Sequence, residues 1–423
     1  MGQENSTSYW VKKGAEFYNN GSYDLAGRCF DKAIELNPKS LDSWIYKSEV
    51  LALLNKYDEA LNASKKVIEI DPLNETGWRI EGLLLGRQGK QDEAIHAIDN
   101  AIEINPKSAP LWACKGFILA LHEDNEGMPA IDKAIEIDPK DAIAWTLRAN
   151  ILFWEGKENE SRQACDRATE LDPNLTIAWH SKGFVLSLLG KYNESIQAYD
   201  NAMQSYKNDK HDWSKLFLWD QIGAYESACD YKGFVLSLLG KYNESIQAYD
   251  NAIQTYDNLP LKMSWYTFLR FAYTPDASLD GKGKVLDKLG RYNESILAYS
   301  KAIEINPNST EAWYSKGQDL RKLDRYNESI QAYNNAIEVD PQNHQGNLVD
   351  AWTGKGLALN NQGKYDEALK AFDEVIKLDP NNALAWVNKW SVLNNQGKHD
   401  EAVKAYDEAI RIDPNYADVE ISR

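Results

Sequence analysis

The stretch AWHSKGFVLSLLGKYNESIQAYDNA at residues 178–202 contains two helical patterns separated by a break. Apolar residues recur at helical spacing from Trp179 to Leu188 and again from Ile196 onwards, with a break at Gly190. An Asp-Pro or Asn-Pro pair follows the second pattern in comparable stretches of the chain, and proline cannot continue a helix. The stretch therefore predicts a pair of helices that ends at the proline.

Tryptophan and proline mark the recurrence of this pair along the chain. Six tryptophans follow one another at spacings of 34, 34, 34, 33 and 34, and three more follow a gap at spacings of 39 and 34: Trp10, Trp44, Trp78, Trp112, Trp145, Trp179, Trp313, Trp352 and Trp386. Nine prolines follow this position at an offset of 28, except Pro139, whose offset is 27. Cys229 and Leu279 occupy the tryptophan position in two further units, so the sequence contains eleven repeats.

A small residue recurs in the middle of the first predicted helix. Glycine there costs roughly 1 kcal/mol relative to alanine in a helix interior. Gly183 and its equivalents therefore predict a close approach of the two helices in each repeat. Trp390 replaces the small residue in the last repeat, which puts the close approach there in doubt.

The pattern W-x2-K-G-x-x-L, then A/S-I-x-A-Y-x-x-A, then D-P, with the recurrence described above, resembles the tetratricopeptide repeat (TPR) family, including archaeal or bacterial TPR scaffold proteins. The resemblance covers about nine tenths of the chain. It implies an all-α fold, a right-handed superhelical solenoid of antiparallel helix pairs with a concave groove that binds proteins or peptides. One departure recurs: lysine stands where the family often has leucine, as at Lys47 and Lys182. We expect its stem to lie on the apolar seam and its ammonium in water.

Composition excludes several other classes of protein. A net charge of −17 argues against a phosphate backbone or an anionic lipid surface as the main partner, so we expect no nucleic acid and no membrane. The four cysteines have no paired spacing, which is typical of a reducing compartment. No apolar run is long enough to span a membrane, and the first residues lack a signal-peptide pattern. We expect a cytoplasmic protein.

Signatures of catalysis are absent from the sequence. It contains no HExxH, GxGxxG, phosphate-binding loop or GxSxG motif, and its six histidines are spread through different repeats. Acidic residues recur at fixed positions near helix starts, where the helix dipole explains them. We therefore predict no enzyme activity, no cofactor and no metal. The NES triplets match a glycosylation sequon, but their recurrence at one repeat position indicates a structural role.

The resemblance places the groove residues on the first helix of each repeat. Carried onto this chain, it gives an apolar floor in the middle repeats and a polar, asparagine-rich one in the C-terminal repeats: Phe117, Leu121, Asn150, Phe153, Trp154, Phe184, Leu188 and Phe234, then Arg321, Asn360 and Asn394. The alternative is that some of the apolar residues pack on the neighbouring repeat. Two adjacent large aromatics cannot both face one seam, so Phe153 and Trp154 are the preferred partner anchors. The family's clamp for acidic C-termini is absent, because Val11, Ile45 and Arg79 occupy its positions.

Residues 182–202 return letter for letter at 232–252, at an offset of 50 instead of 34. The 16 extra residues occur twice, and each set follows a second helix whose proline is replaced, by Lys207 and by Asp257. We expect both flanking helices to lengthen into helical hairpins, with Pro275 restarting the next first helix. Their aromatic residues predict either mutual packing or a second docking surface: Trp213, Phe217, Trp219, Trp265, Phe268 and Phe271.

The repeats and inserts together predict the organisation of the chain. We expect an N-terminal tail at 1–6, repeats one to six at 7–206, the elongated hairpin region around repeat seven at 207–276, repeats eight to eleven at 277–414, and a short tail at 415–423. Two functions fit this organisation. One is a non-enzymatic scaffold that binds a protein or peptide in its groove; the other is a structural protein that self-associates through open solenoid ends.

Overall fold

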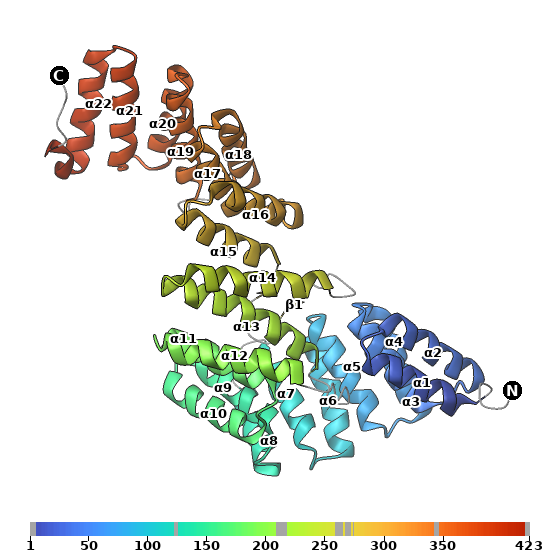
Figure 1. Cartoon of the computed structure of the whole chain (residues 1–423). Coiled ribbons are helices and arrows are strands. Elements are labelled where there is room, and N and C mark those ends of the chain that lie inside the picture. The colour runs from blue at the N-terminus through green and yellow to red at the C-terminus, as the bar shows by residue number, and fades with distance from the viewer. Residues whose placement is uncertain are drawn as a thin grey trace. The chain divides into compact units, whose positions relative to one another are not determined.

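The computed structural model of the chain describes residues 6–121, 126–208, 218–258, 265–266, 272–273, 275–341 and 347–418. Its architecture is a succession of helix pairs, each formed by one repeat (Figure 1). The first helices of the repeats are α1 (Thr7–Asn19), α3 (Leu41–Leu53), α5 (Glu75–Arg87), α7 (Ala109–Leu121), α9 (Ala142–Trp154), α11 (Thr176–Leu188), α13 (Leu218–Leu238), α15 (Pro275–Lys288), α17 (Thr310–Lys322), α19 (Asn347–Asn361) and α21 (Ala383–Asn395).

The second helices follow after short turns in which a residue such as Gly190 adopts positive φ. They are α2 (Tyr23–Leu36), α4 (Tyr57–Ile70), α6 (Gln91–Ile104), α8 (Gly127–Ile137), α10 (Glu158–Leu171), α12 (Tyr192–Asn208), α14 (Tyr242–Asn258), α16 (Tyr292–Ile305), α18 (Tyr326–Val339), α20 (Tyr365–Leu378) and α22 (His399–Ile412). A short 3-10 helix, η1 (Pro414–Asp418), follows α22 and packs on it.

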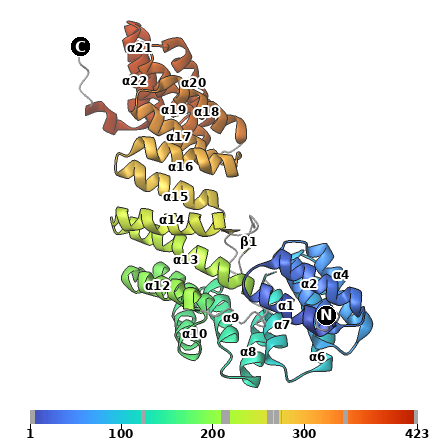
Figure 2. The same cartoon turned by 45° about the vertical axis from the view of Figure 1, so that its right-hand side comes forward.

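The chain divides into two compact units. The first comprises Met1–Val235 with Gln254–Tyr273, and the second comprises Leu236–Ile253 with Thr274–Arg423. Within each unit the next repeat's first helix packs on the preceding second helix, as α5 does on α4 and α17 does on α16. Within its described residues, each unit therefore buries its core between successive helices, as expected of an array in which each repeat contacts only its neighbours. Figure 2 shows the stacked pairs from a second direction.

Hydrogen bonds explain why tryptophan and proline keep the same spacing. The indole Nε1 of Trp179 donates to the carbonyl of Pro173 at 2.8 Å, and Trp44 donates to Pro38 at 2.9 Å in the same way. The proline ends one repeat and the tryptophan begins the next, so this bond fixes the turn between repeats. In the NES triplet, the buried hydroxyl of Ser195 donates to the carbonyl of Gly183 at 2.7 Å. That bond joins the two helices of one repeat and supports the structural role of the serine.

The first insert lengthens helices as predicted, although unequally. Helices α12 and α13 contain 17 and 21 residues, against 14 and 13 in α10 and α11. α12 continues through Lys207 because the proline that stops its equivalents is missing. Trp213 and Phe217 lie outside the described residues, and Trp219 lies in the first turn of α13.

The second insert differs from its predicted helical form. α14 is lengthened to 17 residues, but the stretch expected to form the second helical leg contains two short antiparallel strands, β1 (Trp265–Tyr266) and β2 (Ala272–Tyr273). Trp265 pairs with Tyr273. Aromatic residues favour strands, and an apolar run this short fits either period, which is why the helix prediction was wrong here. Helix α15 does begin at Pro275, as predicted, while Phe268 and Phe271 lie outside the described residues.

The last repeat accommodates Trp390 by a ring contact. Its ring centre lies 5.5 Å from that of Tyr406, at an interplanar angle of 39°. A large residue thus replaces the glycine and still packs on the tyrosine of the second helix.

Candidate protein-binding face of the first unit

Four aromatic side chains of the first unit form a continuous row, called here the aromatic row: Trp154, Phe153, Phe184 and Tyr231. Their successive ring centres lie 5.3, 5.1 and 5.4 Å apart, all in edge-to-face geometry. The residues come from α9, α11 and α13, the first helices of three consecutive repeats. Edge-to-face contacts of this kind add stability beyond simple burial, so the rings of the row are held in a fixed arrangement.

The row is buried at its centre and exposed along one edge. Phe184 is 5% exposed, whereas Trp154, Leu188 and Phe234 are 43%, 54% and 51% exposed. These three residues are called here the apolar rim. Leu188 follows Phe184 by four residues and Phe234 follows Tyr231 by three, the spacing at which residues share a helix face. Isolated exposed apolar side chains are ordinary, but a group on neighbouring first helices is typical of a binding surface.

A neutral histidine lies against the row. The ring of His180 is 1% exposed, and its centre lies 5.9 Å from that of Tyr231 and 6.0 Å from that of Tyr199. Burial lowers the pKa of His180 to about 3, so the imidazole is uncharged at neutral pH. Neither ring nitrogen of His180 has a hydrogen-bond partner among the described residues. The amide nitrogen Nδ2 of the buried Asn150 also has no partner among them. The row is thus accompanied by polar groups whose hydrogen-bonding capacity is unused.

Other predicted groove residues lie in different surroundings. Phe117 is 6% exposed and belongs to the hydrophobic core, which is the alternative considered from the sequence. Leu121 is the last residue of α7, and nothing is described of its side chain. In the second unit, Asn360 accepts from Asn395 at 3.2 Å, Asn394 lies 3.1 Å from the ring nitrogen Nδ1 of His399, and Arg321 is half-buried. The structure therefore joins only part of the predicted set into one surface.

The structure also contains a charge ladder that was not predicted from the sequence. At most seams between repeats, the basic residue three positions after the tryptophan position contacts an aspartate on the preceding repeat's second helix. The pairs are Lys47–Asp31 (2.5 Å), Lys115–Asp99 (2.7 Å), Arg148–Asp132 (2.7 Å), Lys182–Asp166 (2.8 Å), Lys232–Asp200 (2.5 Å), Lys282–Asp250 (2.5 Å) and Lys389–Asp373 (2.6 Å). These are called here the seam pairs.

The seam pairs explain the recurring lysine. The ammonium of Lys182 also lies 5.1 Å from the ring centre of Trp179, so it is placed between an indole face and a carboxylate. At one seam the charges are exchanged, so that Glu81 stands at the basic position and Lys65 at the acidic one. Burial raises the pKa of Glu81, and the charge of Lys65 partly opposes this effect. The feature of the sequence that could have revealed the seam pairs is a regular offset between the basic and the acidic residue. It is 16 positions at most seams and 32 where an insert intervenes.

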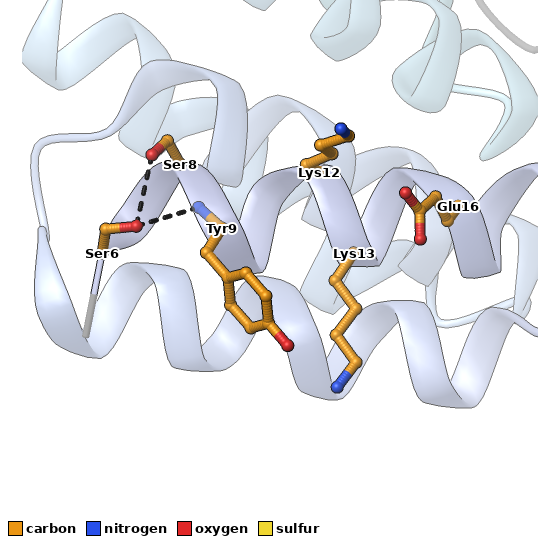
Figure 3. Close-up of a pocket in the computed structure, with 6 residues that line it drawn as sticks. All are labelled: Ser6, Ser8, Tyr9, Lys12, Lys13 and Glu16. Carbon is orange, nitrogen blue, oxygen red and sulfur yellow. Dashed lines mark hydrogen bonds between the residues drawn. The ribbon is translucent and has the colours of Figure 1, made fainter. Parts of the chain in front are cut away.

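A shallow pocket of about 510 Å³ lies beside α1. Figure 3 shows its lining residues: Ser6, Ser8, Tyr9, Lys12, Lys13 and Glu16. The hydroxyl of Ser6 accepts from the backbone N–H of Tyr9 at 3.3 Å and so caps the helix. The ammonium of Lys13 lies 5.2 Å from the ring centre of Trp10. Both contacts lie within α1 and its N-cap, so they stabilise the first helix.

Features typical of other protein classes are missing from the described ranges. No three His, Cys, Asp or Glu side chains gather there as a metal site would require. The four cysteines are buried thiols, and burial raises the pKa of Cys114 to about 11, which disfavours the reactive thiolate. No described helix combines the length and apolar character that crossing a bilayer requires.

Family profiles identify the repeats independently. Profiles described as tetratricopeptide repeat match residues 7–40 and 177–209, 29–62, 310–343 and 353–417, and one described as TPR repeat matches 283–318. The chain belongs to the tetratricopeptide repeat family. Proteins of this family are in general interaction scaffolds without catalytic activity. Residues 82–109 also match a profile of anaphase-promoting complex subunit 5.

Similarity to individual proteins is limited. An uncharacterized protein of Methanocaldococcus jannaschii is 46% identical over 46 residues, which are 11% of this chain and 54% of that protein, so the match spans about half of the relative. Among solved structures, the APC/C hetero-tetramer Cut9–Hcn1 aligns with 99% of this chain and 96% of its own, at 12% identity and a TM-score of 0.41. A TPR protein of Thermus thermophilus aligns over 40% of this chain and 92% of its own, at 20% identity and a TM-score of 0.37.

Proposed function

We propose that the protein is a non-enzymatic scaffold that binds a segment of another protein on the aromatic row and apolar rim of its first unit. The observation that carries this proposal is the combination of a packed aromatic row with three half-exposed apolar side chains on neighbouring first helices. Trp and Tyr are enriched in binding hot spots, and the contacts that surround a hot spot exclude water from it.

The chemistry of the surface defines the segment it suits. The residues of the row and rim carry no charge, so an apolar or aromatic stretch of the partner would gain free energy by leaving water to cover them. The unused hydrogen-bonding groups of Asn150 and His180 are buried beneath this surface, where an ordered water can satisfy them. A partner segment rich in aliphatic and aromatic side chains fits this surface best.

Site-specific photo-crosslinking tests the location of the surface. A photoreactive phenylalanine analogue at Trp154 should crosslink to the partner in the native host, and the same group at Leu25 of α2, an equally exposed position at 44%, should not. Equal crosslinking at both positions would place the partner elsewhere. Purification through each crosslink, followed by mass spectrometry, identifies the partner.

Substitution then measures the contribution of the surface. Trp154→Ala should weaken binding by about 2 kcal/mol and leave helicity largely intact, because the side chain is half-exposed and alanine is the better helix former. The double change Phe153→Ala and Trp154→Ala should weaken binding further. It also removes the packing of Phe153 on Phe184, so circular dichroism must accompany it. Leu25→Ala is the matched control, and loss of binding there as well would contradict a localised surface.

A further inference from the structure

Two lysines at consecutive seams of the second unit have no seam partner. Lys316 and Lys355 occupy the same repeat position as the lysines of the seam pairs. The position of the aspartate is taken by Ser300 and by Asn334, and neither lysine forms an ion pair with a described residue. The hydroxyl of Ser300 instead donates to the carbonyl of Ile296 in its own helix at 2.7 Å.

The surroundings of both lysines otherwise match those of a seam pair. The ammonium of Lys316 lies 5.4 Å from the ring centre of Trp313, and that of Lys355 lies 4.5 Å from the ring centre of Trp352. In the complete pairs of the same kind, Lys182 and Lys389 lie 5.1 and 5.2 Å from their tryptophans. The indole half of the arrangement is thus present at both seams, and only the carboxylate is missing.

Electrostatics shows that the missing acid is not replaced by nearby charges. Burial lowers the pKa of Lys316, and Glu328 and Glu304 only partly oppose this effect, while Arg325 adds to it. Burial likewise lowers the pKa of Lys355 against the charges of Glu367 and Glu338. A half-buried ammonium without a close counter-ion gains more from a carboxylate than an exposed one does.

The two lysines lie in register on adjacent first helices. Helices α17 and α19 contact each other within the second unit (Figure 1). Packed helices lie about 8–10 Å apart, and in a polyproline-II segment, which has three residues per turn, the side chains of residues i and i+3 point to the same side about 9 Å apart. One extended segment can therefore present a carboxylate to each ammonium.

We propose that Lys316 and Lys355 bind two carboxylates of an acidic segment of a partner protein, which take the places that Asp166 and Asp373 fill at complete seams. The partner completes two indole–ammonium–carboxylate arrangements that the chain leaves incomplete. This contact is separate from the aromatic row and does not depend on it. The chain's net charge of −17 repels acidic segments at long range. An acidic segment therefore binds only if its carboxylates match the spacing of the two lysines.

A synthetic peptide tests the proposal on the full chain. The probe is fluorescein-labelled Gly-Gly-Glu-Gly-Gly-Glu-Gly-Gly-Glu-Gly-Gly, and its twin has glutamine at each glutamate. Fluorescence anisotropy at about 0.15 M salt screens the long-range repulsion and leaves contact pairs effective. The glutamate peptide should bind at least tenfold more tightly than the glutamine peptide. Equal affinities, or no measurable binding of either peptide, would overturn the proposal.

Restoring the acids within the chain provides the sharper test. Ser300→Asp with Asn334→Asp should weaken peptide binding at least tenfold and raise the melting temperature, because each lysine then has its own seam partner. Lys316→Met with Lys355→Met should also weaken binding, whereas Lys389→Met, at a complete seam, should leave it within twofold. If the aspartate variant folds normally and binds the peptide as tightly as the original protein does, the proposal is refuted.

Two further measurements distinguish this site from a general anion site and from the aromatic row. Inorganic phosphate at 10 times the peptide concentration should not displace the peptide; displacement would indicate a site for free anions instead of a protein segment. Trp154→Ala should leave peptide binding unchanged, because the aromatic row lies in the first unit. The two proposals can therefore fail independently.

Discussion

Gly183 of α11 lies against the ring of Tyr199 in α12, so closely that a Cβ atom at position 183 would come within 2.6 Å of the tyrosine Cε1. Tyr199 is fully buried. The same relationship joins Gly283 to Tyr299, also at 2.6 Å. The mid-helix glycine therefore costs intrinsic helix stability and gains the packing of a whole tyrosine ring between the two helices of its repeat.

Gly183→Ala should destabilise the protein by about 1–3 kcal/mol, because the new methyl group overlaps a buried ring that has no room to move. Gly27→Ala in α2 is the matched control. Its nearest neighbour is Val50 at 3.5 Å, an ordinary contact, so the better helix propensity of alanine should stabilise by up to about 1 kcal/mol. Thermal unfolding followed by circular dichroism measures both variants. A neutral Gly183→Ala would show that the helices can separate without cost.

The periodic part of the fold was predictable because one physical unit is repeated. Trp179 and Pro173 keep their spacing along the sequence because an indole hydrogen bond joins them at 2.8 Å. The mid-helix glycine likewise indicated the close approach that Gly183 and Tyr199 show. Repetition averages out the errors of any single repeat, and so the helix pairs could be predicted from the sequence.

What was not predicted lies where the repetition fails or where contacts cross between repeats. The strands β1 and β2 occur in an insert without a second copy to confirm its period. The seam pairs join positions on different repeats, such as Lys182 and Asp166, and each partner alone resembles an ordinary solvated charge. On a helix, one position also separates Phe153, which packs on Phe184, from the exposed Trp154. Sequence patterns do not resolve that difference.

A single repeat should not fold alone. The ring of Phe30 in α2 is fully buried and stacks on Tyr46 of the next repeat, with ring centres 5.1 Å apart and an interplanar angle of 5°. A fragment of residues 1–43 lacks Tyr46 and exposes this ring to water. It should show weak helicity without a cooperative thermal transition, whereas residues 1–107, with three repeats, should unfold cooperatively. Cooperative unfolding of the shorter fragment would contradict the repeat-array account.

Residues 414–418 should limit association through the last repeat. The 3-10 helix η1 packs on α22, where the hydroxyl of Tyr406 donates to the carbonyl of Tyr416 at 2.8 Å. Truncation after Asp413 uncovers Tyr406, and exposed end repeats favour association. Sedimentation across a concentration series should show more self-association for the truncated protein than for the full chain. Tyr406→Phe removes only the hydrogen bond and should behave as the full chain does.

The last prediction concerns a buried acid of α13. Glu226 is fully buried, and neither carboxylate oxygen has a hydrogen-bond partner among the described residues. Burial raises the pKa of Glu226 to about 8, and no positive charge of the described part of the chain offsets this effect. The acid is therefore protonated in the folded protein at neutral pH, whereas in the unfolded chain it ionises near its ordinary value of about 4.3.

The sign of the pH dependence follows from this difference. The folded protein binds the proton more tightly than the unfolded chain, so Glu226 lowers the free energy of unfolding as pH rises from about 4.3 to about 8. Glutamine is close in shape and has no charge to bury. Glu226→Gln should therefore match the original protein near pH 4 and become more stable than it as pH rises, by about 4–5 kcal/mol at pH 8. Urea unfolding at a series of pH values measures the difference between the two proteins.

Glu294 is the control, because the Arg291 side chain, which donates hydrogen bonds to it at 2.6 and 2.7 Å, holds the pKa of this exposed carboxyl below its ordinary value. Glu294→Gln should therefore give no stabilisation at high pH. A stability difference for Glu226→Gln that stays constant from pH 4 to pH 8 would show that the acid does not titrate on unfolding, and that the effect of the substitution lies in packing alone.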